Sequence, residues 1–330
     1  MFSRSAVAVT TGMLALSLLT ACGSSSGGTD AAGGSKSDKI TMGFAQVGAE
    51  SGWRTANTKS IQSSAADAGI TLKFTDAQQK QANQIQSIRS FIQQKVDVIA
   101  FSPVVESGWD SVLKEAKDAK IPVILTDRAV DSQDKTLYKT FLGSDFVKEG
   151  TKAGDWLVKD SASATGDVNI AEIQGTTGSA PAIDRQTGFK AAIAANPKLK
   201  IIASQTGDFT RAGGKQVMEA FLKAHPKGIN VVFAHNDDMA LGAIEAIEGA
   251  GLTPGKDIKI VSIDAVKDGM TALSEGKINY IVECNPLLGP QLMDVAKQVV
   301  AGETVPTRIE TKETEFDQAA ATAALPTRQY

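Results

Sequence analysis

Cysteine and histidine are both scarce in this sequence, with two of each among 330 residues. That scarcity excludes a disulfide framework and leaves almost no ligands for a soft metal ion. Charge is not concentrated either: 34 lysines and arginines stand against 37 aspartates and glutamates, and no basic block occurs, so DNA or RNA is not expected as a partner. The chain is 42% hydrophobic and 22% charged, which is typical of a globular protein, and its length predicts two domains of about 150 residues.

Motifs of nucleotide-binding proteins and metalloproteases are missing as well. The sequence has no GxGxxG after a strand, no GxxxxGK[ST] and no HExxH. One glycine-rich turn occurs at 175–180, but a single turn of this kind is weak evidence for a nucleotide site. Neither His225 nor His235 has a carboxylate or cysteine partner at metal-ligand spacing. We therefore expect no cofactor, no metal and no enzymatic activity.

What is present begins with a segment typical of exported proteins. Residues 1–21 place Arg4 before an apolar stretch that is too short to span a membrane, as in a signal peptide. The stretch ends in Leu19-Thr20-Ala21-Cys22, which resembles a bacterial lipobox and predicts a lipid on Cys22; an ordinary secretory signal is the alternative. Residues 22–38 are rich in Gly and Ser and predict a flexible tether. We expect a lipid-anchored protein on the extracytoplasmic face of the cell membrane.

The rest of the chain alternates between strand and helix patterns. Short β-branched apolar runs, typical of buried parallel strands, are separated by amphipathic stretches such as the one with Ile85, Ile88, Phe91 and Ile92 on one face. This order predicts an α/β fold of two doubly wound parallel-sheet lobes. The ten expected strands lie within 39–47, 69–77, 96–103, 121–128 and 136–144, and then within 167–175, 199–208, 229–237, 258–266 and 279–286.

Polar side chains follow many of these runs, at the strand ends where a doubly wound sheet binds its ligand. They are carboxylates, guanidinium groups and an amide, accompanied by two aromatic rings, without a nucleophile and general base side by side. Planar polar groups can each bond two neighbouring hydroxyls, and an aromatic ring packs well on the apolar face of a sugar. The set therefore suits a sugar, and its candidates are Glu50, Trp53, Arg54, Asp127, Arg128, Arg185, Phe209, Asn236, Asp264 and Glu283.

The charged candidates also have simpler interpretations. Asp127 and Arg128 could form a local ion pair at the surface, where such pairs contribute about 0–1 kcal/mol. Glu50 and Arg54 are four residues apart and could merely pair along one helix. Arg185 could lie on a solvated helix face.

The remaining candidates have alternatives of the same kind. Trp53 and Phe209 could be packing residues rather than sugar contacts. Asn and Asp are both preferred helix caps, and here we expect Asn236 to contact the ligand and Asp237 to cap the helix that follows. Cys284 is expected to be a partly buried thiol near a hinge.

The chain resembles a known family over about residues 40–310. The sequence segments that carry the likeness are Gly48–Arg54, DAQQKQANQIQSIRSF, SPVVESGWDSVLKEAKDAKIPV, TGDFTRAGGKQVMEAF and AHNDDMALGAIEAI. They are similar to the sugar-binding proteins of ABC importers, the group that contains the ribose- and galactose-binding proteins, and above all to its galactofuranose-binding members.

This resemblance implies a type I periplasmic binding protein fold with three hinge strands, near Gly143-Ser144, near Cys284 and near residue 310. The implied N-terminal lobe is 39–143 plus 285–310, and the implied C-terminal lobe is 144–284 plus 311–330. Trp53 and Phe209 would stack on a monosaccharide, which would be galactofuranose or a related aldose. The residues implied to hydrogen-bond it are Glu50, Arg54, Asp127, Arg128, Arg185, Asn236, Asp264 and Glu283.

We therefore expect a monomeric receptor that binds a monosaccharide between two closing lobes and delivers it to an ABC permease. A sugar-sensing receptor for a membrane signalling system has the same fold and is the alternative. A sugar-responsive repressor would need a DNA-binding segment where the lipobox lies. A glycosidase would need a carboxylic acid with a raised pKa, and the arginines that alternate with the acids here favour ionised carboxylates.

Overall fold

The computed structural model describes residues 39–330, which form one compact unit. The expected signal peptide, the lipid attachment at Cys22 and the tether lie outside the described residues. Among the helices of the described part, none is both long and apolar enough to cross a membrane.

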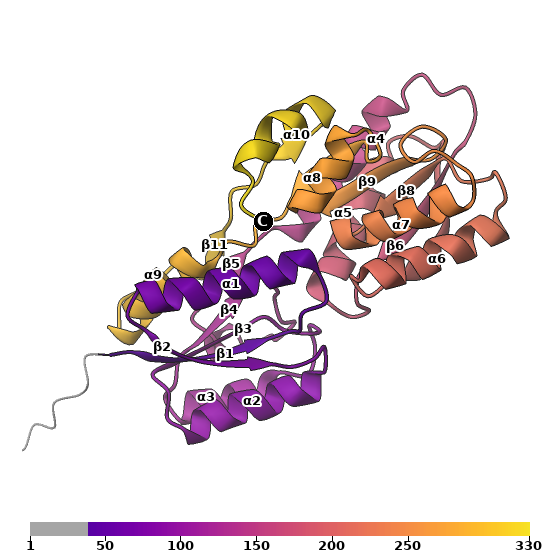
Figure 1. Ribbon diagram of the computed structural model, residues 1–330. Coiled ribbons are helices and arrows are strands. Elements are labelled where there is room, and N and C mark those ends of the chain that lie inside the picture. The colour runs from indigo at the N-terminus through magenta and orange to yellow at the C-terminus, as the bar shows by residue number, and fades with distance from the viewer. Residues whose placement is uncertain (1–38) are drawn as a thin grey trace, which may run out of the picture. The chain divides into compact units, whose positions relative to one another are not determined.

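The first lobe is built on a six-stranded sheet in which all neighbouring strands are parallel. Helices α1 and α9 cover one face of this sheet, and α2 and α3 cover the other (Figure 1). In sheet order the strands are β11 (Arg308–Glu310), β5 (Thr140–Gly143), β4 (Val123–Thr126), β3 (Val98–Phe101), β1 (Thr41–Gln46) and β2 (Thr71–Asp76). The helices are α1 (Gly52–Asp67), α2 (Gln81–Gln93), α3 (Asp110–Asp118), the short η1 (Lys135–Leu137) and α9 (Gly289–Val300).

The second lobe repeats this plan, with one antiparallel strand at the edge of its sheet, β12 against β10. In sheet order the strands are β12 (Glu315–Phe316), β10 (Tyr280–Glu283), β9 (Lys259–Asp264), β8 (Val231–Ala234), β6 (Val168–Gln174) and β7 (Leu199–Thr206). The helices are α4 (Phe146–Asp160), α5 (Ala180–Ile193), α6 (Arg211–Ala224), α7 (Asp237–Gly249), α8 (Lys267–Ser274), α10 (Gln318–Ala324) and η2 (Leu325–Thr327).

All ten expected strands are present, and the predicted fold class, two doubly wound parallel-sheet lobes, is confirmed. The central strands β3, β4, β8 and β10 are buried along their whole length, as expected when helices cover both faces of a parallel sheet. Two strands were not predicted, β11 and β12, because three- and two-residue strands that contain charged side chains lack an apolar run.

The chain passes between the two sheets three times. The first crossing, residues 144–145, follows β5; the second, residues 284–288, follows β10; and the third, residues 311–314, joins β11 to β12. Helix α9 packs against α1, so the chain returns to the first lobe after its tenth strand. The expected three-strand hinge is therefore present.

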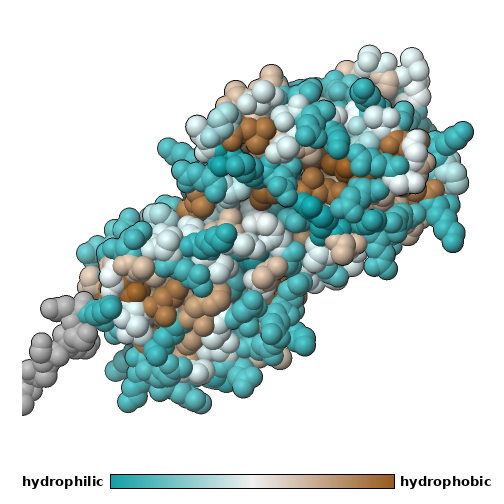
Figure 2. Space-filling view, viewed as in Figure 1, coloured by the Kyte–Doolittle hydropathy of each residue, from teal (hydrophilic) through white to brown (hydrophobic). Residues whose placement is uncertain are grey.

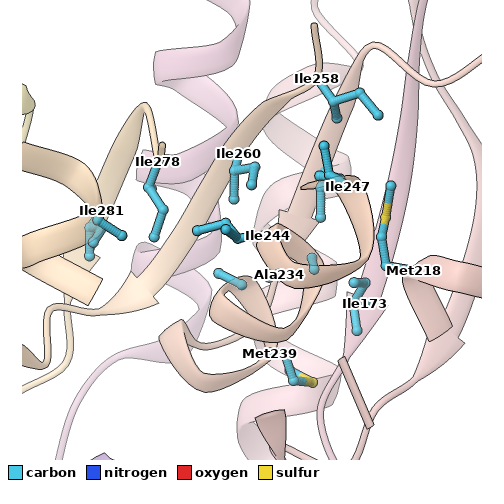
Figure 3. Close-up of a cluster of buried hydrophobic side chains, with 14 of the residues drawn as sticks. Ile173, Met218, Ala234, Met239, Ile244, Ile247, Ile258, Ile260, Ile278 and Ile281 are labelled. Carbon is cyan, nitrogen blue, oxygen red and sulfur yellow. The ribbon is translucent and has the colours of Figure 1, made fainter. Parts of the chain in front are cut away.

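Each lobe has its own apolar core. In the second lobe, Ile173 of β6 and Ile260 of β9 lie in one cluster with Met239, Ile244 and Ile247 of α7 (Figure 3). The face drawn in Figure 2 is mostly hydrophilic over both lobes, with hydrophobic residues in small separate patches. These cores fix the sheets, and the sheets in turn fix the strand ends from which the polar candidates project.

Candidate functional site

The strand ends of both lobes face one cavity. The free volume of this cavity is small, about 20 Å³, so its walls lie close to one another. Nine of the ten predicted residues line it, together with four others; the lining is Glu50, Ser51, Trp53, Arg54, Asp127, Arg128, Phe146, Pro181, Arg185, Phe209, Asn236, Asp264 and Cys284.

Arg54 is the central charge of the first lobe. It lies in the first turn of α1, which begins after the N-cap Ser51. Its Nε is 3.1 Å from Glu50 Oε1 and its Nη2 is 2.7 Å from Asp127 Oδ2. Burial alone would lower the pKa of Arg54, but the two carboxylates raise it above its usual value. The i,i+4 pair with Glu50 therefore exists, but it is buried in the cavity wall rather than exposed on a helix surface.

Arg128 is the second guanidinium of this lobe. Asp127 before it has a φ of +62°, which turns the chain sharply at the end of β4. Arg128 is only 3% exposed; its Nη1 donates to Val104 O at 3.3 Å, and its Nη2 lies 3.6 Å from Glu50 Oε1. Burial and the nearby Arg54 lower the pKa of Arg128 to about 10. A loose surface ion pair between Asp127 and Arg128 is thus excluded.

Arg185 plays the corresponding part in the second lobe. It lies on α5, but its side chain is buried: Nε is 2.7 Å from Glu149 Oε2, Nη1 donates to His235 O at 2.6 Å, and Nη2 is 3.6 Å from Asp264 Oδ1. Burial alone would lower the pKa of Arg185, and the neighbouring acids, first of all Glu149, raise it. Arg185 therefore lies on a helix, as the simpler interpretation had it, but its side chain is buried and not solvated.

Asn236 takes the capping role that was expected of Asp237 and also lies at the cavity. Asn236 is itself the N-cap of α7, because its side chain accepts a hydrogen bond from Met239 N at 3.0 Å, and it also lines the cavity. The expectation that Asp237 caps this helix is wrong. The Asp237 carboxylate instead accepts from Ser262 Oγ at 2.6 Å and from Val266 N at 2.8 Å, behind the cavity.

The two aromatic candidates lie on opposite lobes. Phe209 has a φ of +61° and its ring covers Gly175, where an added Cβ would lie 1.8 Å from the ring. The glycine-rich turn at 175–180 thus provides space for this ring, a role that the sequence did not reveal. Trp53 donates from Nε1 to Cys284 O at 2.7 Å, so its position is fixed by a residue of the second crossing.

Glu283 is the one predicted site residue that the structure does not bring to the cavity. Its Oε1 accepts from Arg328 Nη1 at 2.8 Å and from Tyr330 Oη at 2.7 Å, while its Oε2 accepts from Thr314 N at 2.9 Å. Arg328 and Tyr330, close to the C-terminus, therefore take up the hydrogen-bonding capacity of this carboxylate. Four lining residues were not predicted as contacts, because each is small, apolar or positioned by a distant element. They are Ser51, Phe146, Pro181 and Cys284.

Among residues 39–330, two polar atoms of the cavity wall have no hydrogen-bond partner. They are Glu50 Oε2, an acceptor, and Arg128 Nε, a donor. A buried polar atom without a partner costs roughly 1–3 kcal/mol, more when charged. A ligand that both donates and accepts would satisfy the two atoms together, as a hydroxyl does.

One group of described residues comes close to a metal-binding arrangement. Possible ligand atoms of Glu149, Cys284 and Glu313 lie within 4.8 Å of one another. However, Glu149 already pairs with Arg185, and Glu313 Oε1 accepts from Thr311 Oγ1 at 3.0 Å. Bonds within the protein therefore account for the close approach of these three side chains.

Comparison with known proteins agrees with this geometry. A family model described as a periplasmic binding protein domain matches residues 42–304. The galactofuranose-binding protein YtfQ of Escherichia coli (strain K12) is 51% identical over 272 residues, which cover 82% of this chain and 85% of the relative.

Solved structures give the same result. A Mycobacterium smegmatis protein in complex with β-D-fucofuranose is 68% identical, with a TM-score of 0.87 over 88% of this chain and 95% of that one. The binding protein of the arabinose ABC transporter from Shewanella sp. ANA-3, bound to α- and β-L-arabinofuranose, is 49% identical, with a TM-score of 0.84 over 88% and 96%. The expectation of a binding protein rather than an enzyme is thereby confirmed. This chain belongs to the periplasmic binding protein family.

Proposed function

We propose that the protein is the receptor of an ABC sugar importer and binds a monosaccharide in its five-membered furanose form, with galactofuranose as the first candidate. The observation that carries this is the cavity between the lobes, where Glu50 Oε2 and Arg128 Nε are buried without a hydrogen-bond partner among the described residues. The relatives described above bind galactofuranose, fucofuranose and arabinofuranose, which supports a furanose over other monosaccharides.

The geometry suggests how binding would work. Glu50, Arg54 and Arg128 reach the ligand from the first lobe, and Arg185, Asn236 and Asp264 reach it from the second. A ligand bonded to both lobes stabilises the closed arrangement relative to the open one by its differential affinity. The closed receptor would then dock on the permease, and no bond in the sugar is broken.

The proposal includes the parts that frame this site. The lobes would comprise 39–143 plus 285–310 and 144–284 plus 311–330, and they would move about the three crossings. Cleavage before Cys22 and its lipidation would hold a monomeric receptor at the outer face of the cell membrane. Mass spectrometry of the membrane-extracted protein tests this part, because a lipid adds a defined mass to the peptide that begins at Cys22.

Calorimetry and thermal unfolding with a panel of sugars test the central claim. The panel contains a galactofuranoside, arabinose, fucose, ribose, galactose, glucose, fructose and inositol. At a concentration of about 1,000 times Kd, a ligand stabilises by roughly 4 kcal/mol, which is a shift of several degrees in Tm. A response to sugars that populate furanose rings supports the proposal, and silence across the panel rejects it. Loss of sugar uptake on deletion of the gene would distinguish import from sensing.

Replacement of Arg128 tests the site. Because a hydrogen bond from a charged donor contributes about 1.5–3 kcal/mol, we expect Arg128→Ala to weaken sugar binding by roughly 10- to 100-fold. Arg89→Ala is the matched control, since Arg89 is half exposed and pairs only with Glu115 at the surface. Equal affinity of Arg128→Ala and the wild-type protein would reject the proposed site.

A further inference from the structure

Next to the sugar cavity, a second polar cluster joins the three crossings between the lobes. Ser144 lies in the first crossing, Cys284 in the second, and Thr311 and Glu313 in the third. Ser144 Oγ is 3.4 Å from Cys284 Sγ and 3.3 Å from Thr311 Oγ1. We call these four residues the hinge cluster. Nothing in the proposed contacts to the sugar requires them.

Glu313 is the residue of this cluster that connects to every crossing. Its carboxylate accepts hydrogen bonds from Ser144 Oγ and from Thr311 Oγ1, and one of its oxygens lies within 4.8 Å of Cys284 Sγ in the second crossing. The crossings move relative to one another when the lobes rotate, so these groups converge on one carboxylate only in a particular arrangement of the lobes. The arrangement described here is one in which the lobes touch.

Two hydrogen bonds at the cavity mouth identify this arrangement as closed. Gly52 N of the first lobe donates to Asp238 Oδ2 of the second at 2.9 Å, and Glu106 N donates to Gly178 O at 2.9 Å. Both bonds join the lobes, so both must break when the cavity opens. The contacts of Glu313 with all three crossings therefore coexist with closure.

The hinge cluster also touches the wall of the sugar cavity. Cys284 itself lines the cavity, and Glu149 connects the cluster to Arg185: its Oε2 binds Arg185 Nε at 2.7 Å, and one of its carboxylate oxygens lies within 4.8 Å of Cys284 Sγ and of a Glu313 carboxylate oxygen. Glu149 is 1% exposed, and no described residue makes a hydrogen bond to its Oε1. A shift of Glu313 would thus act on the Glu149–Arg185 pair that faces the sugar.

We propose that Glu313 is a positioning residue that stabilises the closed lobes by joining the three crossings, and thereby sets how long the sugar remains bound. This rests on the proposed function, because it assigns a role in retaining that function's ligand. Glu313 does not line the cavity, so its effect would be similar for every sugar that the receptor accepts.

Hydrogen exchange on the full chain tests the proposal at two defined amides. Gly52 is the first residue of α1, where a helix supplies no partner for the N–H, so its protection reports the bond to Asp238 and hence closure. Glu106 N reports the second bond between the lobes. We expect Glu313→Gln to speed exchange at both amides by about tenfold, with and without sugar, and to raise the sugar dissociation rate by a similar factor.

Two further variants make the result decisive. Ser144→Ala removes the donor of the first crossing and should change exchange and dissociation in the same direction. Glu303→Gln removes one acid from an exposed position after α9 and should change neither. If Glu313→Gln and Ser144→Ala keep wild-type exchange at Gly52 and Glu106 and wild-type dissociation, the proposal is wrong. If the wild-type protein binds no sugar, the proposed function fails, and exchange in the sugar-free variants still decides the role of Glu313.

Discussion

At the scale of single residues, each buried guanidinium near the cavity lies between two acids. Arg54 is held by Glu50 and Asp127, and Arg185 by Glu149 with Asp264 nearby. Burying these charges costs several kcal/mol per ion, and the pairing offsets that cost within the folded chain. The side chains are therefore already oriented when a ligand arrives, and binding does not have to order them.

A second buried pair makes stability depend on pH. Glu172 accepts hydrogen bonds from Ser204 Oγ at 2.5 Å and Gln186 Nε2 at 2.8 Å, and its Oε1 lies 3.2 Å from His235 Nε2. Burial raises the pKa of Glu172, but these bonds, His235 first, outweigh it and lower the pKa to about 2. Burial also lowers the pKa of His235, so a neutral imidazole donates to the carboxylate.

Acid should therefore destabilise the protein through this pair. The unfolded chain takes up protons at His235 below a pKa of 6.5 and at Glu172 below 4.5, while the folded chain resists both. We expect this pair to lower Tm as the pH drops from 6.5 towards 2, and Glu172→Gln to lower stability at pH 7 by about 1.5–3 kcal/mol, because it removes hydrogen bonds to a charged acceptor. In the variant, the further loss of Tm below pH 5 should be smaller.

Thermal unfolding of both proteins at several pH values measures this dependence. Glu115→Gln is the control, since Glu115 pairs with Arg89 at the exposed surface and such pairs contribute little. Parallel Tm curves for the wild-type protein and Glu172→Gln across the acid range would contradict the assignment.

At the scale of elements, the approach of α4 to α5 fixes Arg185. The two helices lie so close that a Cβ at Gly150 would be 2.1 Å from Arg185 O, and a Cβ at Gly188 would be 2.0 Å from Val147 O. Only glycine fits at these contacts without moving a backbone. The position of Arg185 in the cavity therefore depends on two residues that do not line it.

Substitution of Gly150 tests this dependence. Gly150→Ala must push α5 away, so we expect a loss of about 1–3 kcal/mol in stability from overpacking, together with weaker sugar binding because Arg185 moves. Gly249→Ala is the matched control: Gly249 ends α7 with nothing near its Cβ position, and alanine there should be neutral or should stabilise by up to about 1 kcal/mol. Urea unfolding and calorimetry measure both effects. If Gly150→Ala is destabilised but binds the sugar with wild-type affinity, the packing of α4 against α5 does not control the position of Arg185 in the cavity.

The elements also explain what the sequence could predict. The ten strands were readable because buried parallel strands are runs of β-branched residues, and the site because polar residues follow those runs at one edge of each sheet. The sequence could not predict that Glu283 lies outside the cavity, since its partners Arg328 and Tyr330 are 45 and 47 residues away. The choice of Asn236 over Asp237 as the cap depends on Ser262 and Val266, which lie on a neighbouring strand and helix end.

At the scale of the whole molecule, closure brings a carboxylate of one lobe to the first helix of the other. Asp238 Oδ2 accepts from Gly52 N, the first amide of α1, which has no partner within its own helix. Asp238 does not line the cavity, and burial raises the pKa of its carboxyl. The bond exists only between closed lobes, so it contributes to closure and not to the folding of either lobe.

Asp238→Ala should therefore weaken binding without weakening the fold. A hydrogen bond with one ionised partner contributes about 1.5–3 kcal/mol in a buried setting and less at a partly wet cavity mouth, so we expect a loss of roughly 3- to 10-fold in sugar affinity. The change should appear in the dissociation rate, while Tm without sugar stays within about 1 °C. Asp167→Ala is the control, because Asp167 is exposed on the same lobe and pairs with Lys200 at the surface. Stopped-flow dissociation and unfolding without sugar distinguish the outcomes. An unchanged dissociation rate would mean that the lobes close without this bond. A fall in Tm without sugar would mean that Asp238 stabilises its own lobe.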